Sequence, residues 1–392
     1  MWPLNRLAPN HWQTPWMAAA AVAIAAAVAG SAIIFLRQVR AQHAMLRALL
    51  SHRRDLMASD RQAWTTRDGG HALAVYYRSP PGPLASVDAP AGNGGAPLLI
   101  VLIHGMGGQA TQYAPYYEHF SRSAAVLTLD LLGHGESARA SQADAYTTDR
   151  IVGDLCDVVC HPAWTQRHLL LVGHSYGAHL AVLLRQRLDN LRAKHETASP
   201  ADRPALPVVA GLVLLCPKLF VSMKERAHAR QLRRLPRWLI TLMRWWDRRG
   251  GVRSTSVARQ VHPAAPPSVR ATVLAFNAAF ETCTLVRVAA GALPAPPGVH
   301  ERLANCATAI VVGEADRVTP AAQEGLRMQK LLEQERRPPE PPVTWPAQTA
   351  PSVADGPVHT YTVVPAGHAI LVEAEAAVIA AIEGLRRSLY VV

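Results

Sequence analysis

The chain has 392 residues, 49% of them hydrophobic, and a formal net charge of +12. This length accommodates one large domain with insertions, and this hydrophobic content excludes a wholly disordered chain. The positive charge is concentrated between Pro217 and Ala290, where fourteen Lys and Arg residues accompany three acidic residues. A local basic excess suits an anionic membrane surface or an acidic substrate. No nucleic-acid-binding signature accompanies it, so we expect no nucleic acid as a partner.

The sequence contains five cysteines and no Asn-x-Ser/Thr glycosylation site. An odd number of cysteines without framework spacing argues against a disulfide scaffold, and both features favour a reducing compartment. Cys156 and Cys160, followed by His161, supply the ligands for half of a metal site. No second ligand pair follows them, so we expect neither a metal ion nor another cofactor.

The N-terminal region predicts a membrane anchor. After a tail at residues 1–16, the run Met17–Leu36 contains no charged residue. As a helix with a rise of about 1.5 Å per residue, it matches a bilayer core of about 30 Å. Arginines follow this run and are scarce before it, which predicts a single-pass protein with its main part on the cytoplasmic side. A signal peptide cleaved near Ala29 and a mitochondrial presequence are the two alternatives.

A basic linker at residues 37–61 precedes the main domain, which we assign to residues 62–392. The linker is expected to be helical over Leu46–Asp60. The main domain begins with a predicted hairpin over Gln62–Tyr77, because Asp68-Gly69-Gly70 supplies a tight-turn signal between two strand-like segments.

Short apolar runs then alternate with helical stretches such as Asp149–Arg167 and Ala178–Lys194. Continuous apolar strands separated by helices predict an α/β fold with a mostly parallel sheet covered on both faces. The apolar runs are Leu98–Ile103, Ala125–Leu129, Leu169–Val172, Val208–Leu215, Thr308–Val312 and Thr360–Val364.

Two stretches interrupt this alternation. Residues 217–298 are too long for a strand-to-helix connection and are predicted to form a cap or lid. Residues 336–357 are rich in proline and predicted to form an exposed loop. Within the cap, Arg230–Arg249 combines arginines, tryptophans and an apolar stripe at helical spacing. Such a helix either lies in a membrane interface or packs its stripe onto the domain core with its arginines in water, and the sequence leaves both open.

The pattern Gly173-His174-Ser175-Tyr176-Gly177 lies between an apolar strand and a predicted helix. A tight strand–turn–helix connection needs small residues beside the serine, and it exposes the hydroxyl at a helix N-terminus. Ser175 is therefore a candidate nucleophile. The glycine-rich segment His104–Gly108 follows another strand, and its backbone can approach a ligand closely. We expect the backbone N–H groups of Met106 and Tyr176 to stabilise a developing negative charge.

A base and an acid that orients it are found on later loops. Asp316 follows the strand Thr308–Val312, and Glu314 on the same loop is an alternative acid. His368 follows the strand Thr360–Val364, and a neutral imidazole is the natural general base near physiological pH. The three candidates therefore occur in the chain order serine, acid, histidine, which is one of the known orders of a catalytic triad.

These motifs resemble the α/β-hydrolase superfamily, specifically its abhydrolase-domain lipase and esterase group. The resemblance covers most of Leu98–Leu385 and implies an α/β-hydrolase fold with Ser175, Asp316 and His368 as the triad. It gives no support to an acyltransferase, because the run after His368 ends in Glu373. The motifs that carry it are His104–Gly108, Asp130-Leu131-Leu132-Gly133-His134-Gly135-Glu136-Ser137, Gly173–Gly177, Gly313–Pro320 and Ala366–His368.

Combined with the predicted anchor and basic cap, the resemblance implies a membrane-associated, lipase-like serine hydrolase. Its expected partners are a lipid bilayer and a small acyl or ester substrate. A non-catalytic scaffold of the same fold and a thioesterase or peptidase are the alternatives. The sequence indicates neither the acyl group nor the oligomeric state.

Overall fold

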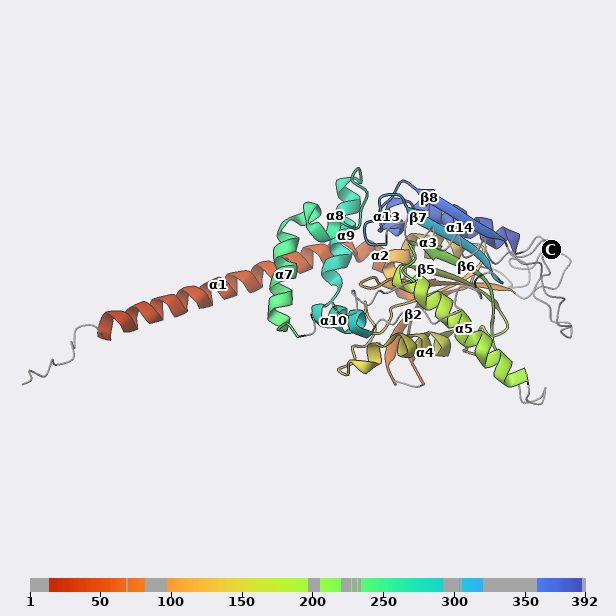
Figure 1. Cartoon of the computed structure of the whole chain (residues 1–392), viewed down its shortest axis with the longest axis horizontal. Helices are drawn as coiled ribbons and strands as arrows, with labels where there is room; N and C mark the ends of the chain where they lie inside the picture. The colour runs from red at the N-terminus through yellow and green to blue at the C-terminus, as the bar shows by residue number, and fades with distance from the viewer. Residues whose placement is uncertain are drawn as a thin grey trace, which may run out of the picture.

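An eight-stranded β-sheet forms the centre of the computed structural model (Figure 1). The structure describes residues 14–67, 70–81, 97–196, 205–219, 227, 231, 234–291, 303, 305–319 and 358–389. The strand order is β1-β2-β4-β3-β5-β6-β7-β8. The strands are β1 Arg61–Thr65, β2 Ala72–Arg78, β3 Leu98–Ile103, β4 Ala125–Leu129, β5 His168–His174, β6 Val208–Leu215, β7 Ala307–Gly313 and β8 His359–Val364.

The pairing of these strands confirms the predicted mostly parallel sheet. β1 and β2 form the expected antiparallel hairpin, and β2 also pairs antiparallel with β4. From β4 to β8 every neighbouring pair is parallel. All six apolar runs that predicted strands lie in strands. Parallel pairing brings the carboxyl ends of β3, β5, β7 and β8 to one edge of the sheet, and the loops that carry the candidate residues emerge there.

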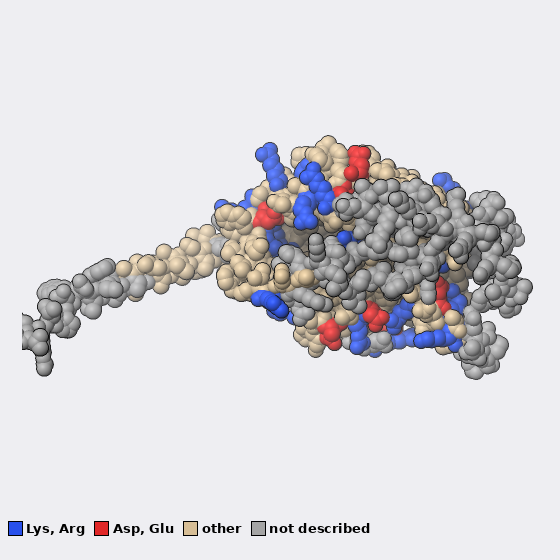
Figure 2. All heavy atoms as spheres, viewed as in Figure 1, with Lys and Arg blue, Asp and Glu red and all other residues tan. Residues whose placement is uncertain are grey.

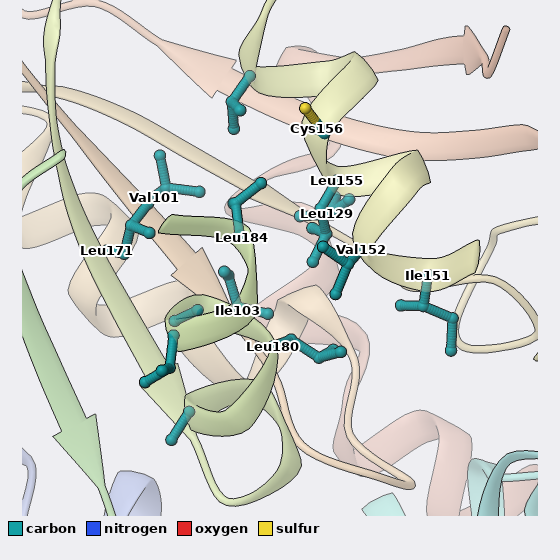
Figure 3. Packing of buried hydrophobic residues seen from close by; sticks show 14 of the residues in the cluster. Val101, Ile103, Leu129, Ile151, Val152, Leu155, Cys156, Leu171, Leu180 and Leu184 are labelled. Carbon is teal, nitrogen blue, oxygen red and sulfur yellow. The ribbon is translucent and has the colours of Figure 1, made fainter. Parts of the chain in front are cut away.

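Alternate residues of the central strands point into two separate cores. In β3, Val101 and Ile103 pack in the core beneath α4 and α5, whereas Ile100 and Leu102 pack in the core beneath α3 and α14. Figure 3 shows the first of these cores, with Leu184 of α5 among its members. This alternation explains why the strands are apolar throughout. The helices are α3 Ala114–Phe120, α4 Thr148–Val159, α5 Tyr176–Glu196, α13 Ile370–Glu373 and α14 Glu375–Ser388.

The cap predicted at residues 217–298 is helical over much of its described part. It lies between β6 and β7 in the sequence and beside the inner half of α1 in Figure 1. Within the segment Arg230–Arg249, helix α7 spans Arg237–Arg249 and begins directly after Pro236. The proline-rich loop predicted at residues 336–357 lies outside the described residues. The cap helices are α7 Arg237–Arg249, α8 Thr255–Ala258, α9 Pro267–Ala279 and α10 Thr282–Gly291.

Helix α7 exposes much of its apolar side to solvent and turns two of its arginines, Arg244 and Arg248, toward the protein. Trp238 and Trp246 are 68% and 67% exposed, and Leu242 between them is also exposed. On the other side, Arg248 is buried and Arg244 is largely buried. Packing of the apolar stripe onto the core, with arginines in water, is therefore wrong for these residues. Arg244 instead donates hydrogen bonds to the carbonyl oxygens of Asn277 and Phe280 and to Thr282 Oγ1.

Helix α1 spans Thr14–Leu49 and includes the run Met17–Leu36 that we expected to cross a membrane. It projects from the main body in Figure 1, and it also contacts α9. Its strongly apolar segment covers only Val22–Ile34, and no single helix in the described part of the chain is long and apolar enough to cross a bilayer. The predicted transmembrane anchor is thus not supported, because the alanines that fill the run are only weakly apolar.

The predicted linker joins the packed domain before its expected boundary. The helix expected over Leu46–Asp60 is divided, because α1 ends at Leu49 and the short helix α2 follows at Ser51–Asp55. Leu50 is buried against residues of α9, and Met57 is buried in the core beneath α3 and α14. The second half of the predicted linker is therefore part of the folded domain.

Helix α4 is shorter than the predicted helix Asp149–Arg167. It ends at Val159, and turns follow up to Arg167. Pro162 accounts for the difference, since the ring of a proline disfavours helical backbone at the preceding residue, here His161.

Candidate active site

Ser175 occupies a strained turn between the end of β5 and the start of α5. Its φ of 54° lies in the left-handed region, which is costly for a residue with a side chain. Its backbone N–H donates to the carbonyl oxygen of Leu215, at the end of the neighbouring strand β6, over 2.8 Å. The predicted strand–turn–helix arrangement is confirmed.

The glycines on either side of this turn have no room for a side chain. A Cβ on Gly173 would lie 2.4 Å from the carbonyl oxygen of Gly177. A Cβ on Gly177 would lie 2.2 Å from the carbonyl oxygen of Ile103, at the end of β3. The small residues therefore allow the turn to pack directly against the adjacent strand end, and this packing fixes the position of Ser175.

The structure brings Ser175, His368 and Asp316 together in one hydrogen-bonded chain. His368 Nε2 lies 2.9 Å from Ser175 Oγ, and His368 Nδ1 lies 2.8 Å from Asp316 Oδ2. A carboxylate accepts from Nδ1–H, so Nε2 carries the lone pair and accepts from the serine hydroxyl. The imidazole and the carboxylate are both buried. This geometry is that of a nucleophile with its base and the acid that orients the base.

Asp316 is held as an ionised carboxylate by several donors. Its Oδ1 accepts the backbone N–H groups of Val318 and Thr319, each over 2.8 Å, and its Oδ2 accepts the Thr319 hydroxyl over 2.6 Å. Burial alone would raise the pKa of Asp316, but the hydrogen bonds from His368 and Thr319 outweigh burial and lower this pKa to about 2.

Glu314, the alternative acid, points elsewhere. Its side chain is largely exposed, and its Oε1 lies 3.3 Å from His262 Nε2. Asp316 is therefore the acid that the structure places against His368.

The predicted oxyanion donors lie on two segments beside the serine. Tyr176 is the first residue of α5, where backbone N–H groups have no partner within the helix. Met106 lies in the loop after β3 and lines the same pocket as Ser175. A Cβ on Gly105 would be 3.1 Å from Ser175 Cβ, so this loop packs directly against the nucleophile. The role of Met106 and Tyr176 as donors to an oxyanion stays a prediction.

Two buried histidines hold the loop that contains Met106. His104 Nδ1 lies 2.8 Å from the carbonyl oxygen of Gly105, and its Nε2 accepts the backbone N–H of Leu131 over 3.0 Å. His134 Nε2 accepts the backbone N–H of Gly107 over 3.2 Å. His104 thus has a structural position, and His134 joins the loop after β3 to the loop after β4.

The run from Asp130 to Ser137 also has a structural arrangement. Asp130 accepts the backbone N–H groups of Ala110 and Glu136 over 2.7 and 2.9 Å. A Cβ on Gly135, whose φ is +47°, would collide with the Asp130 carboxyl group at 2.2 Å. Burial raises the pKa of Asp130 to about 6 despite these two donors.

Sequence reasoning missed three side chains that support the histidine and its acid. Glu373 accepts the backbone N–H groups of Gly367 and His262 over 3.0 and 2.7 Å, and so fixes the loop before His368. His174 Nε2 lies 2.8 Å from the carbonyl oxygen of His368. Thr319 is the only one with a local signal, because a hydroxyl three residues after an aspartate commonly bonds to it.

The described residues offer little for a metal ion. They include one group of three potential ligands whose atoms lie within 4.8 Å of one another, namely Cys216, Asp316 and His368. Asp316 and His368 are already bonded to each other, and burial raises the pKa of the Cys216 thiol, which opposes the thiolate that a metal requires. Cys156 and Cys160 have their sulfur atoms 3.8 Å apart and belong to no such group in the described part of the chain.

Comparison with known proteins agrees with this fold and geometry. The model of the alpha/beta hydrolase family matches residues 100–381, which contain all the candidate site residues. The chain belongs to the alpha/beta hydrolase family. In this alpha/beta hydrolase the matched region extends from β3 to α14 and includes the cap.

Two curated proteins are similar to parts of this alpha/beta hydrolase. An abhydrolase domain-containing protein of Schizosaccharomyces pombe is 29% identical over 233 residues, which are 56% of this chain and 58% of that protein. A hydrolase of Acinetobacter baylyi that acts on (E)-2-((N-methylformamido)methylene)succinate is 40% identical over 86 residues, which are 21% of this chain and 30% of that protein. The chain thus covers less than two thirds of the length of either relative.

A solved structure is similar over more of the alpha/beta hydrolase. The esterase of Thermogutta terrifontis has a TM-score of 0.57 and 18% identity, and the match covers 84% of this chain and 99% of the esterase. At this identity the similarity establishes the fold alone.

The first prediction concerns the close packing at Gly177. We expect Gly177→Ala to lower the free energy of unfolding by about 3 kcal/mol or more, because its Cβ meets backbone that cannot move aside. Gly384→Ala is the control, since nothing lies within 4 Å of its Cβ in α14, and it should raise stability by about 0.5–1 kcal/mol. Urea unfolding measures both. A Gly177→Ala protein as stable as the wild type would contradict the packing described for the turn.

The second prediction concerns stability at acid pH. Burial lowers the pKa of His174 to about 3, that of His134 to about 4, and that of His104 well below its usual value. Below pH 6.5 the unfolded chain therefore binds more protons than the folded chain, so stability falls with falling pH. Each of these histidines should cost about 2 kcal/mol between pH 7.5 and pH 5.

The variant His134→Gln tests this directly, because it removes one of the three buried imidazoles named above, whose pKa is lowered by burial. We expect its free energy of unfolding to fall less steeply than that of the wild type between pH 7.5 and pH 5, by about 2 kcal/mol over the interval. His52→Gln, at an exposed position, should keep the wild-type slope. Equal slopes for His134→Gln and the wild type would show that His134 is not buried in its neutral form.

Proposed function

We propose that the chain is a serine hydrolase that cleaves carboxylic esters through an acyl-enzyme. One observation carries the proposal: Ser175, His368 and Asp316 form a continuous hydrogen-bonded chain with Ser175 and His368 on the wall of a pocket. Two further features support the same conclusion. The turn at Ser175 stores backbone strain, which is typical of functional sites, and the glycine-rich loop beside it can bring backbone N–H groups close to a developing oxyanion.

Each group has a role in the proposed reaction. His368 Nε2 takes the proton of Ser175 as Oγ attacks the ester carbonyl carbon. The resulting oxyanion accepts hydrogen bonds from the backbone N–H groups of Met106 and Tyr176. His368 then gives its proton to the leaving alcohol, and a water molecule repeats the sequence to release the acid. Asp316, ionised because its pKa is about 2, stabilises the imidazolium throughout.

The third prediction tests the nucleophile. A fluorophosphonate probe should label the purified wild-type chain, because the activated Oγ of Ser175 displaces fluoride from phosphorus. Ser175→Ala should not be labelled, and its ester hydrolysis should fall by at least about a thousandfold. The control Ser51→Ala changes an exposed serine and should be labelled like the wild type. Absence of labelling in the wild type would favour a non-catalytic scaffold of the same fold.

We extend the proposal to a substrate at a lipid surface. The support is the exposed apolar surface of α7, where two tryptophans and the leucine between them face solvent, while Arg244 and Arg248 of the same helix face the protein. Tryptophan is the residue typical of membrane interfaces. The projecting part of α1 adds exposed apolar residues, and its described surface in Figure 2 is uncharged. These residues are Val22, Ile24, Val28, Ile33, Ile34 and Leu36.

The fourth prediction tests this surface. The double variant Trp238→Ser and Trp246→Ser should bind vesicles of anionic phospholipid at least about tenfold more weakly than the wild type, because burial of each indole contributes about 1 kcal/mol or more. Co-sedimentation with vesicles measures binding. Val363→Ser, an exposed apolar position on β8, is the matched control and should bind like the wild type. Equal binding by all three proteins would remove α7 from the proposal.

A further inference from the structure

The pocket beside Ser175 contains polar atoms that the triad does not use. His174 Nδ1, Asn277 Nδ2 and Gln112 Oε1 are buried, and no group in the described protein pairs with them. All three side chains line the pocket that contains Ser175 and His368. Buried polar atoms are rarely left without a partner, so three in one pocket call for an explanation.

The hydrogen-bond partners of His174 determine what its free atom offers. Its Nε2 lies 2.8 Å from the carbonyl oxygen of His368, which can only accept. Nε2 therefore carries the proton, and Nδ1 presents a lone pair. The side chain is 8% exposed, and burial lowers its pKa to about 3, so the ring stays neutral at physiological pH. His174 thus carries a fixed hydrogen-bond acceptor, buried in the wall of the pocket.

The orientation of Asn277 follows from a second fixed carbonyl. Gln260 Nε2 donates to the carbonyl oxygen of Ser256 over 3.0 Å and to Asn277 Oδ1 over 3.1 Å. Oδ1 is therefore the accepting side of the Asn277 amide, and the free atom is the donor Nδ2. The hydrogen bond from Arg244 to the carbonyl oxygen of Asn277, over 2.8 Å, joins this part of α9 to α7.

A pocket with a free acceptor and a free donor selects among ligand groups. A hydrocarbon satisfies neither atom, a carboxylate has no proton for His174, and an ammonium group has no lone pair for Asn277. A hydroxyl group donates and accepts through one atom. Leaving either buried atom unpaired in the complex is unfavourable, so the preference for a matching group should be about tenfold or more.

We propose that this pocket binds a hydroxyl group of the substrate, which donates to His174 Nδ1 and accepts from Asn277 Nδ2. The inference rests on the proposed ester hydrolysis and defines its substrate class as esters that carry a free hydroxyl, such as partial esters of polyols. Apolar residues of α9 and α13 complete the pocket wall and would contact the hydrocarbon part. They are Val273, Phe276, Leu371 and Val372.

The experiment compares two esters of similar size with the purified full chain. Glycerol monobutyrate carries two free hydroxyls, and propyl butyrate carries none. The value of kcat/KM for each ester is divided by its rate of alkaline hydrolysis, which removes the difference in leaving-group reactivity. The wild type should prefer the glycerol ester about tenfold or more. A corrected ratio near one would overturn the hydroxyl site, since water would then satisfy the polar atoms equally well.

Two variants of Asn277 attribute the preference to this site. Asn277→Leu removes the donor, and Asn277→Asp replaces it with an acceptor while it keeps the oxygen that Gln260 binds. Each should reduce the corrected ratio about tenfold. Thr272→Val is the control, because it lies on the same helix and does not line the pocket. A wild-type ratio in both Asn277 variants would overturn the proposal.

Further outcomes separate the ligand class from the activity. A preference for the glycolamide ester of butyric acid over the glycerol ester would assign the site to an amide and overturn the hydroxyl. Ready hydrolysis of both glycerol and propyl esters with a ratio near one leaves the hydrolase intact and removes the site. A wild type that resists the fluorophosphonate and cleaves neither ester overturns the hydrolase, and the hydroxyl site with it.

Discussion

The left-handed backbone of Ser175 is the constraint on which the rest of the site depends. This conformation is maintained because the carboxyl ends of β3, β5 and β6 meet there. Gly173 and Gly177 allow this close packing, since a side chain at either position would collide with neighbouring backbone. Cys216, at the end of β6, is the other described residue besides glycine with positive φ, so two adjacent strands end in the same unusual conformation. The sheet supplies the rigidity that these turns require.

Much of the sheet, and the residues that meet at the candidate site, could be predicted from sequence, because their signals are local. A buried parallel strand is apolar throughout, and the elbow needs glycines at fixed spacing. The inward arginines of α7 had no such signal, since Arg244 finds its acceptors 33 to 38 residues away. No sequence signal indicated Asn277 for the same reason, because the orientation of its amide depends on a hydrogen bond from Gln260 in another segment. The expected transmembrane anchor is not supported, because the alanines of the run each contribute little to membrane partition.

The cap and the catalytic centre share polar contacts that join recognition to chemistry. Asn277 lines the pocket while its carbonyl oxygen accepts from Arg244 of α7, the helix on which Trp238 and Trp246 are exposed. The proposed lipid surface and the proposed hydroxyl site are therefore two sides of one group of helices. An ester with a polar head and a hydrocarbon tail fits both.

The bonds of the loop before His368 bear on how substrate enters. Glu373 accepts from Gly367 and from His262, and the N–H of Ala369 donates to the carbonyl oxygen of Gln260 over 2.7 Å. The segment between α8 and α9 is thus tied to the backbone on either side of His368. Lifting this segment away would displace His368 as well. A movement of this segment would therefore also disturb the hydrogen bonds that join His368 to Asp316 and Ser175.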